Sequence, residues 1–414
     1  MNFDRNLKAQ LIWDGGEEVV VPPEMGRPRE DQMCGTMGER LSELGLRICY
    51  DSMGIQPDGT TKKSRSSVEA HKHILEVGHH SVFEHYNFTV ELKPYKPGDQ
   101  ILAVLMNRPG VWVQQRDDSL RVTMNLRCLL DWEAWCCACP PNVQLAANVL
   151  GAGLRELCSP LAPNILGPVE PTRADIRQVM MLDSLKLSSI ELVEPEGEEE
   201  CWISLYVSGS RGFSHELVRH GDRTAMSQRS TRYCNESDGD WIEHPLLTAY
   251  FADSPPCTTP THGCDEQQAS RDDLCTVCGM EVNKHDAKLS LLLSRDALVA
   301  DAKALYKANV KALEAWLIRK GVDKMTALKQ SRGASRGYLG NALCTELIFS
   351  ASVGQWRHML KMRAANAADA EIREVFTKAL PLLKGSRYGK FFDGMELEPA
   401  SDGLSMALAG GGHK

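Results

Sequence analysis

The sequence lacks the features that mark membrane and secreted proteins. Its 414 residues contain no run of about 18 apolar residues, the length that crosses a bilayer as a helix. The first twenty residues have neither the basic stretch nor the apolar core of a signal peptide. These absences predict a cytoplasmic protein without a membrane partner.

The sequence also lacks an excess of positive charge. Its formal net charge is -8, whereas a protein that coats nucleic acid or binds a membrane surface needs a cationic face. A nucleic-acid partner is therefore not expected, and each local cluster of basic residues needs a local explanation.

The amino-acid composition predicts a large globular core. Hydrophobic residues make up 43% of the chain and charged residues 25%, and the length predicts two or three domains. Fourteen cysteines accompany this core. In a chain of this size they favour reduced thiols or a metal site over a disulfide scaffold.

Two stretches of the chain share one plan, a strand followed by a helix. Residues 84–98 and 201–212 alternate apolar and polar side chains and end at glycine, and helical patterns follow each. The acidic stretch 193–200 between them is typical of a charged linker. The pattern predicts a tandem duplication, with a first segment of residues 1–195 and a second of residues 196–414.

Each segment is expected to hold a mainly antiparallel sheet packed with helices, which is an α+β fold. The second segment adds long helical patterns over 287–321 and 352–385, both ending at glycine. The residues from about 395 to 414, rich in Gly, Ser and Ala, predict a flexible tail.

A polar, cysteine-rich insertion spans about 251–285. Cys275 and Cys278 form a C-x-x-C turn, and Cys257 and Cys264 could complete a tetrahedral shell, with His262 among them. A structural zinc would explain how such a loop stays ordered. Four unligated thiols are the open alternative.

The stretch LVRHGDRTAMSQRSTRY, residues 217–233, concentrates arginine. Arg219, Arg223, Arg229 and Arg232 fall on a predicted helix end and the irregular segment after it. Guanidinium groups and freed backbone N–H groups can converge there on an anion such as phosphate. The alternative is that these arginines form ion pairs with the acidic surface.

This stretch resembles the signature of the flavin-dependent thymidylate synthases, R-H-R-x-x-S-x-x-x-x-S-x-R-Y. SQRSTRY fits without a gap, and Arg219 and His220 match the opening pair, but Gly221 or Asp222 replaces the next arginine. That arginine lies near the flavin in the family. The resemblance therefore implies that residues 217–233 keep their nucleotide contacts and lose a flavin contact.

Upstream, GHHSVFEHYNFT resembles the flavin-facing segment of the same family, with His79, Ser81 and Glu84 at the matching positions. Cys49 matches a small family residue that also approaches the flavin. The alternative is a histidine-rich helix end satisfied by its own carboxylate.

Each segment also resembles part of the family's N-x-R motif, in which an arginine eleven residues after the asparagine holds the pyrimidine. The first segment keeps Asn125 and Arg127 but has Cys136 at the arginine position. The second keeps Arg363 but has Ser352 and Gly354 in place of Asn and Arg. The losses are complementary, so the first segment is expected to hold flavin and the second the nucleotide.

The resemblance implies reductive methylation of dUMP to dTMP, with FAD as cofactor and NADPH and methylenetetrahydrofolate as co-substrates. Ser230 would lie beside the pyrimidine ring, and Arg363 would donate to its carbonyl edge. No cysteine nucleophile is required. The implied nucleotide ligands are Glu216, Arg219, Gln228, Arg229, Ser230, Arg232, Arg336 and Arg363, and the implied flavin ligands are Cys49, His79, Ser81, Glu84, Asn125, Arg127, Asp131 and His220.

The family's site is assembled from several subunits of a tetramer, so the fused pair is expected to form a homodimer that acts as a pseudo-tetramer. Three alternatives stay open at this point. The acceptor could be another pyrimidine nucleotide, the chain could be a non-catalytic nucleotide-binding protein, or the cysteine-rich insertion could serve a nucleic-acid or protein partner.

Overall fold

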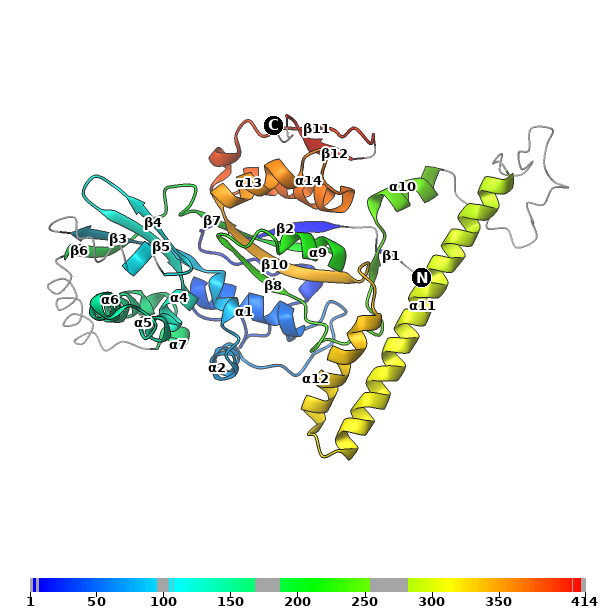
Figure 1. Ribbon diagram of the computed structural model, residues 1–414, viewed down its shortest axis with the longest axis horizontal. Coiled ribbons are helices and arrows are strands. Elements are labelled where there is room, and N and C mark those ends of the chain that lie inside the picture. Colours follow the sequence, from blue (N-terminus) through cyan, green and yellow to red (C-terminus); the bar gives the residue numbers. More distant parts are fainter. Residues whose placement is uncertain are drawn as a thin grey trace.

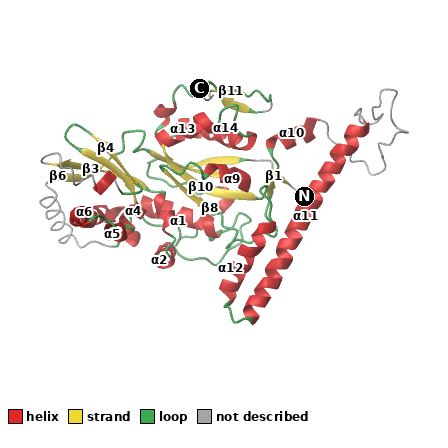
Figure 2. Cartoon of the chain, viewed as in Figure 1, coloured by secondary structure: helices red, strands yellow, loops and turns green. Residues whose placement is uncertain are grey.

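The computed structural model describes residues 3–4, 7–94, 104–106, 108–167, 187–253, 282–403 and 405–410. Within these ranges the fold is α+β, with antiparallel sheets flanked by helices (Figure 2). Two four-stranded sheets dominate, ordered β4-β5-β3-β6 and β2-β7-β10-β8. In Figure 1 the first lies at the left and the second at the centre.

The first sheet comes from the first segment. Its strands are β3 (Asn87–Pro94), β4 (Val111–Gln115), β5 (Leu120–Asn125) and β6 (Leu187–Val193). Side chains alternate along β3: Val90 and Leu92 are fully buried in the apolar core, whereas Thr89 on the other face bonds Thr123 of β5. This alternation is the period-two pattern that predicts a strand.

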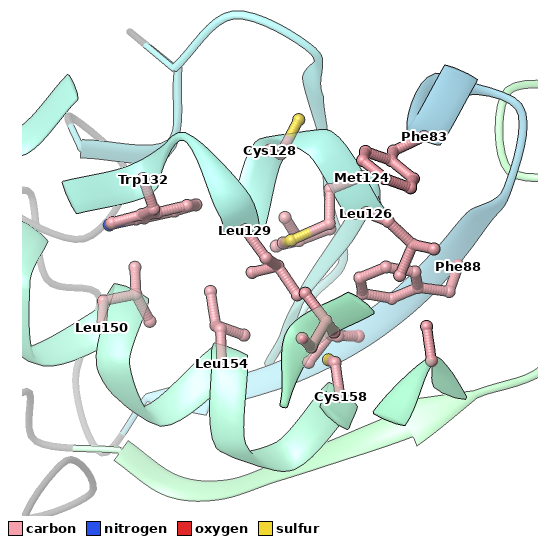
Figure 3. Close-up of a cluster of buried hydrophobic side chains, with 14 of the residues drawn as sticks. Phe83, Phe88, Met124, Leu126, Cys128, Leu129, Trp132, Leu150, Leu154 and Cys158 are labelled. Carbon is pink, nitrogen blue, oxygen red and sulfur yellow. The ribbon is translucent and has the colours of Figure 1, made fainter. Parts of the chain in front are cut away.

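Helices cover the apolar face of this sheet. They are α4 (Leu126–Leu130), α5 (Trp132–Cys136), α6 (Pro141–Cys158), η3 (Ser159–Leu161) and α7 (Pro163–Leu166). Figure 3 shows Leu129, Trp132, Leu150 and Leu154 meeting in the core between these helices and the strands. Gly151 of α6 lets Trp132 approach closely, because a Cβ there would lie 2.0 Å from the indole ring.

The second sheet is buried on both faces. Its strands are β2 (Lys8–Trp13), β7 (Trp202–Ser210), β8 (Thr224–Gln228) and β10 (Cys344–Ser352). One face packs against α9 (Arg211–Leu217), α13 (Val353–Arg363) and α14 (Ala370–Lys384), and the other against α1 (Met37–Tyr50). Every residue of β7 is buried, as a strand between two layers requires.

The two sheets have the same order of strands, and the outer strand β2 of the second sheet comes from the first segment. β6 lies just before β7 in the sequence but pairs with β3, and β2 precedes α1 and β3 but pairs with β7. Counted from those outer strands, β6-β3-β5-β4 corresponds to β2-β7-β10-β8, with every pair antiparallel. The predicted boundary at residue 195 falls in the connection between β6 and β7.

The remaining elements surround this body. A long helix, α11 (Val282–Arg319), and α12 (Lys324–Ser335) form a hairpin at the right of Figure 1. The others are β1 (Phe3–Asp4), η1 (Pro23–Met25), α2 (Ser67–Val77), η2 (His80–Glu84), β9 (Trp241–Ile242), α10 (Pro245–Asp253), η5 (Arg336–Tyr338), η6 (Gly389–Phe392), β11 (Leu397–Pro399) and β12 (Met406–Leu408). None of the described helices combines the length and the hydropathy that crossing a membrane requires.

The structure corrects three expectations about elements. The helical pattern over 352–385 is two helices, because Asp369 accepts a hydrogen bond from the Glu371 N–H and caps a new helix, α14. The segment after the helix end at Leu217 is partly a strand, β8. Of the predicted flexible tail, residues 395–403 and 405–410 are folded, because β11 and β12 pair and Leu408 is buried against the α14 layer. Residues 404 and 411–414 lie outside the described residues.

Candidate functional site

A cavity of about 640 Å³ opens where the two segments meet, and we call it the junction cavity. The first segment contributes the end of α1, one face of α2 and the start of η2; the second contributes β8, the turn after it and α12. Its lining residues are Cys49, Tyr50, His73, Val77, Gly78, His79, Ser81, Met226, Gln228, Ser230, Arg232, Tyr233 and Lys329.

Aromatic rings form the wall where the segments touch. Tyr50 and Tyr233 have their ring centroids 4.5 Å apart, and the Tyr50 hydroxyl lies 3.2 Å from Nδ1 of His79. The Lys329 ammonium lies 4.7 Å from the centroid of the Tyr233 ring, within the range of a cation–π interaction. The Ser230 N–H donates to the Cys49 carbonyl at 3.1 Å, so the two segments are also joined through their backbones.

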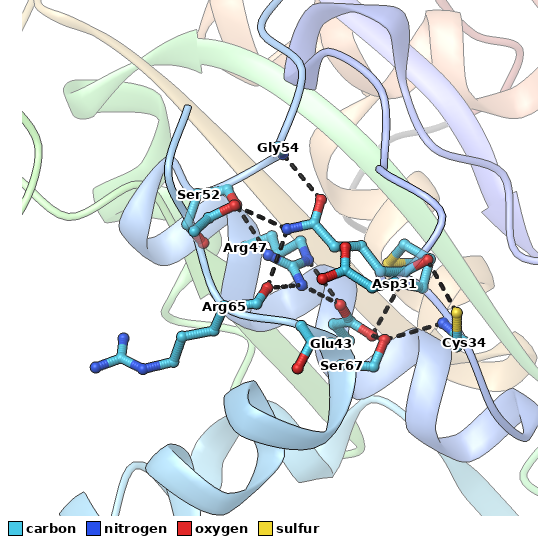
Figure 4. Close-up of polar contacts among 12 residues, drawn as sticks. Asp31, Cys34, Glu43, Arg47, Ser52, Gly54, Arg65 and Ser67 are labelled. Atoms are coloured by element: carbon cyan, nitrogen blue, oxygen red, sulfur yellow. Dashed lines mark hydrogen bonds and ion pairs between the residues drawn. The ribbon is translucent and has the colours of Figure 1, made fainter. Parts of the chain in front are cut away.

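A buried ion pair fixes the helix that carries Cys49 and Tyr50. Within α1, Arg47 Nε donates to Glu43 at 2.7 Å, and the guanidinium also reaches the Arg65 carbonyl at 3.0 Å (Figure 4). Glu43 in turn accepts from the Ser67 hydroxyl at 2.6 Å at the start of α2. The pair therefore ties α1 to α2, the two helices that form this side of the cavity.

The electrostatics of the junction cavity suit an anion. Arg232 and Lys329 bring two fixed positive charges, and no Asp or Glu among the described residues lines the cavity. Burial lowers the pKa of His79 below its usual range, so that imidazole is neutral near pH 7. Burial also raises the pKa of Cys49 to about 12, which keeps the thiol protonated and unreactive.

Six residues that the sequence singled out meet in this cavity. Cys49, His79 and Ser81 from the flavin set face Gln228, Ser230 and Arg232 from the nucleotide set. Tyr50, His73, Tyr233 and Lys329 were missed. Tyr233 closes the SQRSTRY motif and could have been included, whereas no signal in the sequence places Lys329 here.

Three other flavin-set residues form a separate polar network beside the cavity. Arg127 is ion-paired with Glu84, and its Nε donates to Asp131 at 3.0 Å. His80 adds a contact to Asp131 at 2.9 Å. Burial raises the pKa of Glu84, although Arg127 opposes the shift. Burial also acts to raise the pKa of Asp131, but hydrogen bonds from His80 and Arg127 outweigh it and lower that pKa.

Asn125 has a different role. It is the last residue of β5, and its side chain accepts from the Cys128 N–H at 3.0 Å and caps α4. Ser352, at the corresponding position of the second segment, ends β10 and caps α13 in the same way.

Arg363 lies in a third cluster, at the end of α13. Its Nη1 donates to Glu216 at 2.7 Å and its Nε donates to Nε2 of His220 at 2.8 Å. Burial, followed by the nearby Arg363 charge, lowers the pKa of His220 to about 4, so the ring is neutral and able to accept this bond. None of these three residues lines the junction cavity.

The other arginines that the sequence singled out differ in their ion-pair partners. Arg229 lies among three carboxylates, those of Asp51, Glu236 and Glu346, at 3.4 to 3.6 Å. Arg223 pairs with Glu199 at 2.5 Å. Both match the ion-pair alternative. Arg219 and Arg336 are exposed and lie outside the cavity lining.

The predicted zinc ligands Cys257, Cys264, Cys275 and Cys278 lie outside the described residues. Within the described ranges, no group of three or more His, Cys, Asp or Glu side chains could hold a metal ion. The zinc site therefore stays a prediction.

Comparison with known proteins gives consistent matches. The family described as thymidylate synthase complementing protein matches residues 198–386. A flavin-dependent thymidylate synthase of Mycobacterium tuberculosis (strain ATCC 25618 / H37Rv) is 30% identical over 215 residues, which cover 51% of this chain and 68% of that protein. One of Mycolicibacterium gilvum (strain PYR-GCK) is 29% identical over 212 residues, with the same coverage.

Among solved structures, thymidylate synthase X from Helicobacter pylori with FAD and dUMP aligns at 19% identity. The alignment covers 47% of this chain and 73% of that chain, with a TM-score of 0.26. The range that the family model matches lies in the second segment and includes both the arginine stretch and Arg363.

Proposed function

The chain belongs to the flavin-dependent thymidylate synthase family, and we propose on that basis that the junction cavity binds a pyrimidine nucleotide beside FAD. The family activity is reductive methylation of dUMP to dTMP with methylenetetrahydrofolate and NADPH, and the chain is an enzyme of this methyltransferase type. The observation that carries the proposal is the junction cavity, in which side chains from the flavin set and the nucleotide set share one space.

The nucleotide would lie on the second-segment side of the cavity. Arg232 suits its phosphate, because a guanidinium stays charged at any working pH and donates in a fork. Ser230 can donate to the sugar or ring, and its position is fixed by the N–H bond to the Cys49 carbonyl. Gln228 holds its amide by donating to Ser214 at 2.9 Å and Thr345 at 3.0 Å, which leaves its carbonyl oxygen to accept.

Side chains on the first-segment side of the cavity could form hydrogen bonds with FAD. His79 and Ser81 offer neutral hydrogen-bonding groups in the cavity. Arg127, in the adjacent network, and Asn125, at the end of β5, would also hold the flavin. When bound and reduced by NADPH, the flavin supplies hydride. The protein residues bind and orient both ligands, and no Asp or Glu of the described residues lines the cavity around the anion.

Arg363 would stabilise negative charge on the uracil carbonyl as C5 becomes nucleophilic, a role commonly worth about 3 kcal/mol per donor. In one chain its guanidinium is bound to Glu216 and His220, away from the junction cavity. We therefore propose that Arg363 serves the cavity of a second chain. This arrangement makes the active form a homodimer whose four segments act as a pseudo-tetramer.

The division into residues 1–195 and 196–414 is proposed as a duplication. The equal order of strands in the two sheets supports it, as does the shared capping position of Asn125 and Ser352. A duplicated pair can lose complementary contacts and keep one working site from both copies. The cytoplasmic location stays a prediction.

The function is tested by tritium release from dUMP labelled at C5, with FAD, NADPH and methylenetetrahydrofolate present. We expect tritium release from dUMP only when FAD, NADPH and methylenetetrahydrofolate are all present. Labelled UMP and dCMP serve as competing acceptors. Flavin binding without release from dUMP would contradict thymidylate synthesis, and release from UMP or dCMP instead would reassign the acceptor.

A further inference from the structure

Helix α12 presents a row of cations to the nucleotide-binding turn. Lys329 lies over the Tyr233 ring at 4.7 Å, Arg332 donates to the Tyr233 carbonyl, and Arg336 follows about one turn further on. The residues of α12 include no Asp or Glu. This face therefore carries positive charge without any acidic neighbour on its own helix.

The three cations have different surroundings. Arg332 is committed to a backbone carbonyl, so it holds the turn that carries Arg232 and Tyr233. Arg336 is exposed and lies outside the cavity lining. Lys329 is half-buried and lines the junction cavity, and among the described residues no carboxylate lies within ion-pair distance of its ammonium.

Gly333 adds room beside this row. A Cβ at that position would lie 3.8 Å from Cγ of Arg232, in ordinary contact, so a longer side chain would compete with Arg232 for space. The Arg232 side chain therefore lies beside α12 next to Gly333, about one turn from Lys329.

The geometry points to Lys329 as a phosphate-binding residue that acts with Arg232. This inference rests on the proposed function, because it names the part of the nucleotide that these two cations bind. A lysine ammonium has three N–H donors, so its contact with the Tyr233 ring still leaves N–H groups for oxygen acceptors. A phosphate between a guanidinium and an ammonium would receive charge-assisted hydrogen bonds from both. The cavity would thereby select a nucleoside monophosphate over the matching nucleoside.

The test compares dUMP with deoxyuridine, which lacks the phosphate, by calorimetric titration of the full chain loaded with FAD. For Lys329→Met we expect dUMP binding to weaken about ten- to hundredfold, as loss of a charged hydrogen bond implies, and deoxyuridine binding to stay unchanged. Lys329→Arg should restore most of the dUMP affinity. In turnover, KM for dUMP should rise while kcat changes little.

Lys324→Met is the matched control, because Lys324 is an exposed lysine at the start of the same helix. It should leave both affinities unchanged. Equal weakening of dUMP and deoxyuridine by Lys329→Met, or no change in either, would overturn the phosphate role while leaving the proposed function intact. A wild-type chain that binds no dUMP would overturn both.

Discussion

At the scale of single residues, His85 joins the two segments through its side chain. It precedes β3, and its ring lies 2.7 Å from the Ser350 hydroxyl through Nδ1 and 2.8 Å from the Ser227 hydroxyl through Nε2. The side chain is fully buried, and burial lowers its pKa to about 3. The ring is therefore neutral in the folded protein and links the first segment to strands β8 and β10.

This burial predicts a pH-dependent stability. In the unfolded chain His85 takes up a proton near pH 6.5, whereas in the folded chain it does so only near 3. The unfolded state binds more protons in that window, so the free energy of unfolding should fall by about 2 kcal/mol between pH 7 and pH 5 from this residue alone. Urea unfolding at both pH values measures the change.

The control is His85→Gln, which removes the titrating group but keeps hydrogen-bonding capacity. His220, with its pKa lowered to about 4, contributes in the same direction in both proteins, so the difference between them isolates His85. An unchanged pH dependence in the variant would show that His85 is not the source.

The separation of the Arg127 and Arg363 clusters gives a second prediction. Arg127→Ala should weaken FAD retention and leave dUMP affinity largely intact, because Arg127 belongs to the Glu84 and Asp131 network. Arg363→Ala should do the opposite. Flavin absorbance after gel filtration and dUMP titration measure the two affinities. Equal loss of both ligands in either variant contradicts the division of labour.

For some residues the place in or outside the cavity could be predicted from the sequence, and for others it could not. Ser230, Arg232 and Gln228 were predictable because the SQRSTRY motif keeps their spacing. Arg229 sits in the same motif, yet it lies among three carboxylates, of which those of Asp51 and Glu346 are distant in sequence. Lys329 was not predictable, because its proximity to Tyr233 depends on how α12 docks.

At the scale of elements, the C-terminal hairpin of β11 and β12 is part of the fold. The Leu408 N–H donates to the Ala364 carbonyl at 2.7 Å, and the Leu408 side chain is buried in the second core. Composition alone predicted a flexible tail, since Gly and Ser are common there. The described residues of the tail are nevertheless folded, because apolar side chains such as that of Leu408 are buried.

Leu408→Ala should lower the free energy of unfolding by about 2–4 kcal/mol, the usual result of removing a buried leucine side chain. Met406→Ala is the matched control on the same strand, because Met406 is 41% exposed, and it should change stability little. Denaturant unfolding measures both. Equal effects of the two substitutions would mean that the hairpin does not dock as described.

Strands with clean alternation were the most predictable elements. Within the pattern over 84–98, Asn87–Pro94 form β3, Glu84 ends η2 and residues 95–98 lie outside the described residues. Within the pattern over 201–212, Trp202–Ser210 form β7. The break between α13 and α14 was missed, because the alanine-rich stretch between Arg363 and Ala370 carries no proline or glycine to mark it. Only the cap at Asp369 reveals the new helix.

At the scale of the whole molecule, strand β2 interlocks the two segments. β2 completes the sheet of the second segment, and α1 covers that sheet's inner face through Leu41, Leu44 and Ile48. This strand pairing could not be predicted from the sequence, because the alternating side chains of β2 or of β6 would fit the edge of either sheet.

Fragments 1–195 and 196–414 should therefore fail to fold separately and should associate when produced together. The first fragment alone would expose the apolar face of α1, and the second would lack both β2 and that cover. Thermal unfolding followed by circular dichroism distinguishes the cases. A cooperative transition in either isolated fragment would contradict the interlocked fold.

The central claim is that flavin and nucleotide share the junction cavity, and the visible absorption spectrum of bound FAD tests it most directly. Titrating the FAD-loaded chain with dUMP should perturb the flavin spectrum saturably, and Arg232→Met should shift this response to higher dUMP concentration. If dUMP binds while the flavin spectrum stays unchanged, the two ligands occupy separate sites and the claim fails.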